Sequence, residues 1–236
     1  MDVGLLEEVP DMSSAAADDA TLLDPDLAAR NARKEQRRRQ LLDAAARVME
    51  REGSQAVSMQ AVAAEAGVSV GLIYRYFGSK DELLLAVIVN VLEDFAVAVP
   101  AAIDAAGDDP VERLAAAFRG YCEVIDRHRH ATVLTYRESK SLDEAGRERI
   151  KELEVETSRP LSRLLRDGIE AGVFRPVEPE TVAYNLLLVA HAWALKHWYF
   201  ERTYSFDDYV RAQLSLALHG LVQPKHRRRY ARFLQE

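Results

Sequence analysis

The stretch from Ser58 to Leu84 constrains the fold of this chain more than any other part of the sequence. It reads SMQAVAAEAGVSVGLIYRYFGSKDELL and contains three helix starts and two helix stops. Ser58 can cap a first helix, and Gly67 can end it because glycine readily takes the left-handed conformation found at helix C-termini. Ser69 can cap a second helix, and Gly78 can end it. The spacing therefore predicts two short helices joined by a tight turn.

A third helix start follows directly. Ser79 and Glu82 have the Ser-x-x-Glu spacing, in which the hydroxyl and the carboxylate each accept a hydrogen bond from a backbone N–H without a helical partner. An apolar run then predicts a longer helix from Ser79 to about Val97, before Pro100. Two short helices with a glycine in the turn form a helix-turn-helix, whose second helix can lie in the major groove of DNA.

The segments AGVSVGLIYRYFGSKDELL and RRRQLLDAAARVMEREG together resemble the DNA-binding domain of TetR-family transcriptional repressors over about residues 33–84. An ordinary helix-turn-helix would lack the Tyr-x-Tyr-Phe-x-x-Lys run and the capping box after it. The resemblance implies an all-α fold of about nine helices. A three-helix DNA-binding domain would be followed by a helical ligand-binding and dimerisation domain. The alternative is a helical hairpin of an unrelated bundle.

The expected DNA contacts differ in chemistry. Ser58 and Ser69 stand at helix N-termini, where hydroxyls and free N–H groups bind phosphate, so they would position the protein. Val70 and Arg75 are the expected base readers, because an apolar side chain can meet a thymine methyl and arginine can bind guanine through two hydrogen bonds. The resemblance carries DNA contact, position by position, to Val70, Gly71, Tyr74, Arg75, Tyr76 and Lys80.

The remaining roles in this stretch follow from size and polarity. Gly71 lets the backbone approach the groove. Tyr74 and Tyr76 would donate their hydroxyls to phosphate, although Tyr76 has the alternative of packing partly in the core. Lys80 would act as a point charge at the start of the next helix. Ile73 and Phe77 are expected to pack rather than to touch DNA.

Charge is distributed unevenly along the chain. The net charge is -7, but residues 1–32 hold eight acidic residues and one arginine, whereas residues 33–80 hold nine Lys and Arg against five acidic residues. Phosphate contact depends on local charge, so the total does not exclude DNA. We expect a disordered acidic arm at 1–32, the DNA-binding domain at 33–80, a regulatory and dimerisation domain at 81–221, and a basic tail at 222–236 that is either solvated or a further DNA contact.

Several classes of protein are disfavoured. Cys122 is the only cysteine, which excludes an intramolecular disulfide and suits the cytoplasm. No apolar run approaches the ~20 residues of a membrane span, and the acidic N-terminus is unlike a signal peptide. The histidines His128, His130, His191 and His197 lack a carboxylate at a metal-ligand spacing, so no metal or cofactor is expected. No catalytic motif is present, which disfavours the alternative of an enzyme with a helical substrate pocket.

The regulatory and dimerisation domain at 81–221, called the body below, is expected to consist of amphipathic helices. Pro110 stands where a helix begins, residues 131–140 suit a short helix, and residues 142–171 suit one or two helices with Pro160 as a kink or break. Residues 180–201 are apolar on most sides, and such a helix must be covered on more than one face. With residues 205–221 it predicts a four-helix interface between two subunits, which the resemblance also implies. Such a dimer would bind a double-stranded, pseudo-palindromic operator.

Polar and aromatic groups among the apolar body helices suggest a ligand pocket, although satisfied core residues give the same pattern. The candidates are Tyr121, Tyr136, Glu138, Asn185 and Trp193, of which Asn185 and Trp193 share one helix face. The sequence thus predicts a homodimeric repressor released by a small hydrophobic or acyl-type effector. A ligand-independent architectural DNA binder is the alternative, and activation in place of repression stays open.

Overall fold

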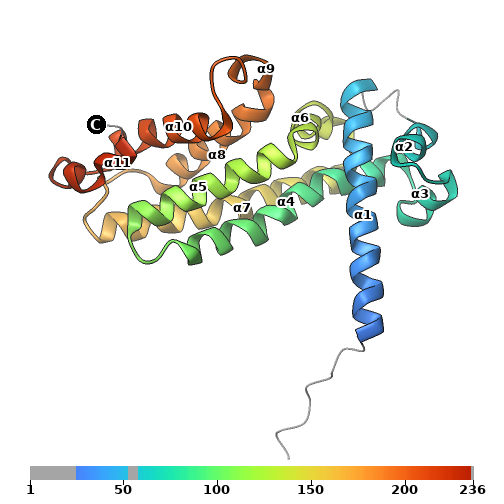
Figure 1. The fold of residues 1–236 in the computed structure, drawn as a ribbon, viewed down its shortest axis with the longest axis horizontal. Coiled ribbons are helices and arrows are strands. Elements are labelled where there is room, and N and C mark those ends of the chain that lie inside the picture. The colour runs from blue at the N-terminus through green and yellow to red at the C-terminus, as the bar shows by residue number, and fades with distance from the viewer. Residues whose placement is uncertain (1–24, 53–57, 235–236) are drawn as a thin grey trace, which may run out of the picture. The chain divides into compact units, whose positions relative to one another are not determined.

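The computed structural model of the chain describes residues 25–52 and 58–234 (Figure 1). These residues form eleven α-helices and two short 3-10 helices, and they contain no β-strand, so the all-α class is confirmed. The first four helices are α1 (Pro25–Glu52), α2 (Met59–Ala66), α3 (Val70–Tyr76) and α4 (Lys80–Ala105). The body continues with α5 (Pro110–Arg127), α6 (Arg129–Glu138), α7 (Glu144–Glu170), α8 (Pro179–Leu195), α9 (His197–Phe200), α10 (Phe206–Leu221) and α11 (Ala231–Leu234). The 3-10 helices are η1 (Ser139–Ser141) and η2 (Pro224–Tyr230).

Helix α1 starts earlier than predicted. It begins at Pro25 rather than Arg33, because proline suits the first helical turn and the following Leu-Ala-Ala favours a helix. The prediction of disorder is therefore wrong for residues 25–32, and the remainder of the predicted arm lies outside the described residues. The described part of the chain divides into two units within α1, between Arg37 and Arg38. The second unit contains the later part of α1 and all the helices after it.

Helix α4 is the central helix of the body and continues past Pro100 to Ala105, eight residues beyond the predicted end. Val99 and Ile103 are buried on either side of the proline, and their packing outweighs one lost backbone hydrogen bond. The prediction that no apolar run could span a membrane is also wrong, because α4 is long and apolar enough by composition. Half of that apolar window is buried, and α4 packs against α5, α6 and α7.

Of two further expectations about the body helices, the first is confirmed in its single-helix form and the second is corrected. Helix α7 runs through Pro160 without a break, since Thr157 and Leu161 on either side of it are buried. The predicted helix 180–201 is interrupted at Lys196, which separates α8 from α9. This interruption brings Phe200 within 4.8 Å of Tyr209, ring centre to ring centre, so an aromatic contact replaces the continued helix.

The end of the chain packs against the body instead of forming a solvated tail. Tyr230 and Leu234 are buried. Asp109 accepts hydrogen bonds from Arg229 at 2.6 Å and from the Tyr230 hydroxyl at 3.0 Å, while its other carboxylate oxygen caps α5 by accepting from Val111 N at 2.9 Å. One carboxylate thus anchors both the start of α5 and the last helical turns.

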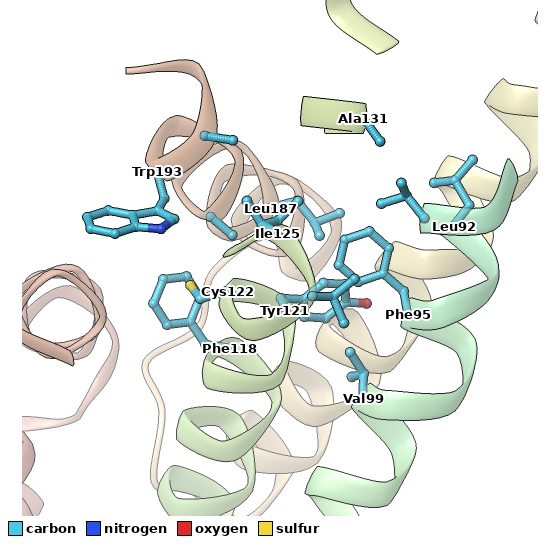
Figure 2. Close-up of a cluster of buried hydrophobic side chains, with 14 of the residues drawn as sticks. Leu92, Phe95, Val99, Phe118, Tyr121, Cys122, Ile125, Ala131, Leu187 and Trp193 are labelled. Carbon is cyan, nitrogen blue, oxygen red and sulfur yellow. The ribbon is translucent and has the colours of Figure 1, made fainter. Parts of the chain in front are cut away.

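Aromatic side chains fill the centre of the body between α4, α5 and α8. Figure 2 shows Phe95, Phe118, Tyr121 and Trp193 gathered with aliphatic neighbours, and all four are buried. The rings of Phe95 and Tyr121 lie 5.0 Å apart. The Tyr121 hydroxyl, on the side of its ring toward Phe95, has no hydrogen-bond partner among the described residues. This core positions the cavity described below.

Replacing Gly168 with alanine is expected to destabilise the chain, because the new Cβ would lie 2.2 Å from Cδ2 of Phe174. Overpacking of this kind costs about 1–3 kcal/mol. Urea unfolding of Gly168→Ala measures the loss, with Asp167→Ala at the exposed neighbouring position as the control, expected within about 0.5 kcal/mol of the parent. Equal stability of the two variants would contradict the close packing of Phe174 on α7.

Candidate DNA interface and ligand cavity

The helix-turn-helix forms by the local signals that its sequence carries. The Ser58 hydroxyl accepts a hydrogen bond from Ala61 N at 3.0 Å at the start of α2. Gly67 ends α2 with φ +65°, and Val68 N donates back to Ala63 O at 2.9 Å. Ile73 is fully buried and fixes α3 within the head, the part of the chain made of the later half of α1 with α2 and α3. Both predicted helices and the turn between them are confirmed.

Two predicted capping contacts differ in detail. Ser69 stands before α3, but its side chain makes no capping hydrogen bond, and α3 ends at Tyr76 with Phe77 after it. At α4 the Ser79 hydroxyl accepts from Glu82 N at 3.1 Å as predicted. The Glu82 carboxylate accepts from Gly78 N at 3.2 Å rather than from Ser79 N.

The predicted DNA-contact residues fall into two groups by exposure. Five are exposed to solvent: Ser58, Ser69, Gly71, Tyr74 and Arg75. Val70, Tyr76 and Lys80 are half-buried, and Val70 and Tyr76 pack against the core of the head. Gly71, Tyr74 and Arg75 stand at helical spacings of three and four, so they share one side of α3. This side lies away from the buried Ile73 and Phe77, whose packing roles are confirmed.

A salt-bridge pair not anticipated from sequence joins α1 to α2. Arg47 Nε lies 3.1 Å from Glu65 Oε1, and Arg51 Nη1 lies 3.4 Å from Glu65 Oε2. The hydrogen bond from Arg47 lowers the pKa of Glu65. The two arginines are one helical turn apart on α1, and nothing in their spacing signals the contact with α2. The pair holds the first helix of the helix-turn-helix against α1.

The body contains a small cavity of about 30 Å³. Its lining comes from five helices, α4 to α8, and comprises Ile88, Val91, Leu92, Phe95, Ile125, Thr132, Thr135, Tyr136, Ile150, Glu154 and His191. The Tyr136 hydroxyl and His191 Nδ1 share a hydrogen bond of 2.7 Å across the cavity between α6 and α8. Such a mostly apolar cavity with a few convergent polar groups is typical of a ligand site.

Burial changes the ionisation of the polar lining. It lowers the pKa of His191 to about 4, so the imidazole is neutral at pH 7. It also raises the pKa of Tyr136 to about 12, with the negative charge of Glu154 as a further cause. The pKa of Glu154 itself is raised because the carboxylate is partly removed from water. At neutral pH these groups provide a phenol, an uncharged imidazole and a carboxyl group.

Of the five predicted ligand residues, Tyr136 alone lines this cavity. Tyr121 lies deeper in the core beside Phe95, and Glu138 is half-buried at the end of α6. Asn185 is exposed, whereas Trp193 is buried and donates from Nε1 to Asp126 Oδ1 at 2.7 Å. The structure therefore does not bring Asn185 and Trp193 to one pocket, because their packing partners differ.

Sequence reasoning missed Glu154 and His191 as cavity residues. Each stands on a different helix from Tyr136, so the residues converge only through packing. A weak signal for Glu154 exists, since it is the acidic residue adjoining Leu153 on the half-buried face of α7. His191 is one of the polar groups that the sequence places among the apolar body helices, but it was weighed there as a core residue or a metal candidate and not selected for the pocket. Among the described residues, no three His, Cys, Asp or Glu side chains gather as metal ligands.

Helices α8 and α10 leave an open apolar groove of about 370 Å³. It is lined by Val177, Val182, Asn185, Leu186, Val189, Gln213, Leu216, Ala217, Gly220 and Leu221. Leu216 is 73% exposed and Leu188, on α8, is 46% exposed. Large aliphatic side chains of this exposure are common where a second protein binds.

Family comparisons agree with both parts of this architecture. Residues 41–87 match the family described as bacterial regulatory proteins, tetR family, and residues 107–221 match the tetracyclin repressor-like C-terminal domain. The chain is 40% identical over 214 residues to the HTH-type transcriptional regulator HbdR of Aromatoleum sp. (strain CIB), covering 91% of this chain and 89% of HbdR. The chain belongs to the TetR family.

Other TetR-family members are similar over most of the chain. The HTH-type transcriptional repressor KstR2 of Mycolicibacterium smegmatis is 27% identical over 190 residues, covering 79% of this chain and 91% of KstR2. The crystal structure of the TetR-family regulator PfmR from Thermus thermophilus superimposes with a TM-score of 0.68 at 26% identity, covering 78% of this chain and 99% of PfmR. The relatives are DNA-binding transcriptional regulators, and the TetR assignment from the helix-turn-helix motif is confirmed.

Proposed function

We propose that the chain is a cytoplasmic repressor that binds a pseudo-palindromic operator as a homodimer and releases it when a small hydrophobic or acyl-type effector enters the body. The observation that carries the DNA-binding part is the exposed side of α3 that presents Gly71, Tyr74 and Arg75. A Cβ built on Gly71 would meet nothing within 4 Å, so packing within the chain does not require glycine there. Close approach of a DNA backbone to α3 does require glycine at this position.

Each DNA contact has a proposed task. Arg75 reads a base edge through two hydrogen bonds, and Val70 meets a thymine methyl from the start of α3. Ser58, Ser69 and the Tyr74 hydroxyl bind phosphate, and Ser69 is suited to this because its hydroxyl does not cap α3. Tyr76 and Lys80 keep proposed phosphate contacts, with the Tyr76 ring also packing 6.2 Å from Phe77.

The groove on α8 and α10 supports the homodimer. Packing of two such grooves around a two-fold axis would cover Leu188 and Leu216 of both subunits. Two heads would then lie over successive major grooves about one helical turn of DNA apart. The interface proposed here lies in the same two regions as the sequence prediction, residues 180–201 and 205–221. Its helices are α8 and α10.

Helix α6 supports a route from effector to head. It contributes Thr132, Thr135 and Tyr136 to the cavity, and its His130 contacts Glu50 of α1. His128, just before α6, bonds Asp94 of α4 at 2.7 Å. An effector that binds more tightly when α6 is in one of two positions would favour one distance between the two heads. Release of the operator requires only that this distance no longer match the spacing of the major grooves.

Selection of bound duplexes from a random DNA library tests this function. The repressor account predicts enrichment of an inverted repeat with half-sites about 10 base pairs apart. Enrichment of a single half-site would contradict the dimer, and absence of any enriched sequence would favour the ligand-independent architectural binder.

A further inference from the structure

The carboxylate of Glu154 lines the body cavity without a bonding partner. Among residues 25–52 and 58–234, no hydrogen bond or ion pair involves this carboxylate; Thr157 donates only to the Glu154 backbone oxygen. The side chain is half-buried, so it has lost part of its water without gaining a protein donor. Such a carboxylate is stabilised by any bound group that donates to it.

The other polar groups of the lining are already paired. Thr132 donates to His128 O at 3.0 Å, and Thr135 donates to Ala131 O at 2.9 Å, in each case to the backbone four residues earlier. Tyr136 and His191 bond each other. Among the described residues that line the cavity there is no lysine or arginine. Glu154 is therefore the acidic group of the lining whose side chain has no protein donor and can accept hydrogen bonds from a ligand.

We propose that this cavity takes an effector with an apolar body and a polar end that is a hydrogen-bond donor without negative charge, a hydroxyl or an amine, held by Glu154. The inference rests on the proposed effector-binding function and names the chemical class of the ligand. An effector ending in a free carboxylate is rejected, because its charge would face Glu154 with no cation in the lining to balance either group.

The size of the cavity sets how the ligand enters. At about 30 Å³ it has room for roughly one water molecule, so any effector must widen it. Tyr136 is 43% exposed, whereas the other residues of the lining are buried or half-buried. Breaking its hydrogen bond to His191 would remove the side-chain bond that joins α6 to α8 at the cavity. The ligand thus gains access by displacing α6, the helix that also contacts α1.

Three probes that share one ring and differ in the polar group test the class: cyclohexylmethanol, cyclohexylmethylamine and cyclohexanecarboxylate. Binding to the full chain at pH 7 is measured by ligand-observed NMR titration. The alcohol or the amine is expected to bind at least about tenfold more tightly than the carboxylate, the effect of one close like charge. Glu154→Gln is expected to reduce this ratio to below about threefold by admitting the carboxylate. Glu156→Gln, at an exposed position on the same helix, should keep the ratio.

The outcomes are distinct. Tighter binding of the alcohol or of the amine supports the proposal and tells whether the donor is neutral or charged. Equal or tighter binding of the carboxylate, no effect of Glu154→Gln, or no binding of any probe overturns it. DNA release is measured separately by fluorescence anisotropy. If the probes bind as expected but operator DNA stays bound, the ligand class stands and the release function fails.

Discussion

Replacing Leu216 with aspartate is expected to yield a monomer and to weaken operator binding by at least about 100-fold. Leu216 is 73% exposed on α10 and lines the apolar groove, so the substitution leaves the fold of one subunit intact. In the proposed dimer the new carboxylate would be buried without a partner, which costs several kcal/mol at an interface. Light scattering gives the oligomeric state, and fluorescence anisotropy gives the operator affinity.

Val97→Asp is the matched control for this substitution. Val97 is also 73% exposed, but it stands on α4 and does not line the groove. The control is expected to remain dimeric with unchanged affinity. A dimeric Leu216→Asp variant, or equal losses in the two variants, would contradict the assignment of the interface to α8 and α10.

Arg75→Ala is expected to weaken binding by about 5- to 150-fold per half-site and to relax specificity at one base pair, because a two-bond contact to guanine is worth about 1–3 kcal/mol. Arg75 is exposed on the side of α3 that carries Gly71 and Tyr74, so its loss leaves the packing of the head unchanged. Competition binding against operators with single base-pair changes measures both effects.

Lys80→Ala provides the contrasting variant. Lys80 begins α4 and would contact phosphate, so its removal is expected to weaken binding to all duplexes alike. The slope of log affinity against log salt should fall by about 1 per protomer. If Lys80→Ala relaxed specificity while Arg75→Ala weakened all sequences equally, the two roles would be reversed.

The head was predictable from sequence because its structure is specified by local signals. Ser58 and Ser79 cap their helices through contacts three residues away, and Gly67 takes the left-handed conformation that its place between two helices requires. The alternation of apolar and polar residues in α3 also places Ile73 inside and Arg75 outside. The start of α1 at Pro25 was missed because the proline indicated a break and residues 25–32 show no sustained apolar period.

The body was less predictable because tertiary packing overrides local signals. Pro100 indicated the end of a helix and Pro160 a kink or break, yet buried neighbours on both sides keep α4 and α7 continuous. The opposite happens at Lys196, where no proline or glycine marks the break between α8 and α9. One sequence alone does not show which side chains, distant along the chain, will pack against these positions.

The cavity shows the same limit. Tyr136 was recognised as a polar group in an apolar helix, but Glu154 and His191 meet it only because α6, α7 and α8 pack together. Asn185 and Trp193 were paired by their spacing on α8, and the structure separates them because α8 is covered by different neighbours along its length. Spacing within one helix predicts a shared face and does not predict a shared partner.

A gel shift with DNA from the region upstream of the protein's own gene, with and without small-molecule extract of the native host, tests the central claim most directly. The account predicts a retarded complex containing two protomers per site, which the extract disperses. Absence of a retarded complex would contradict the assignment as a DNA-binding repressor, and a complex that no extract disperses would contradict its control by an effector.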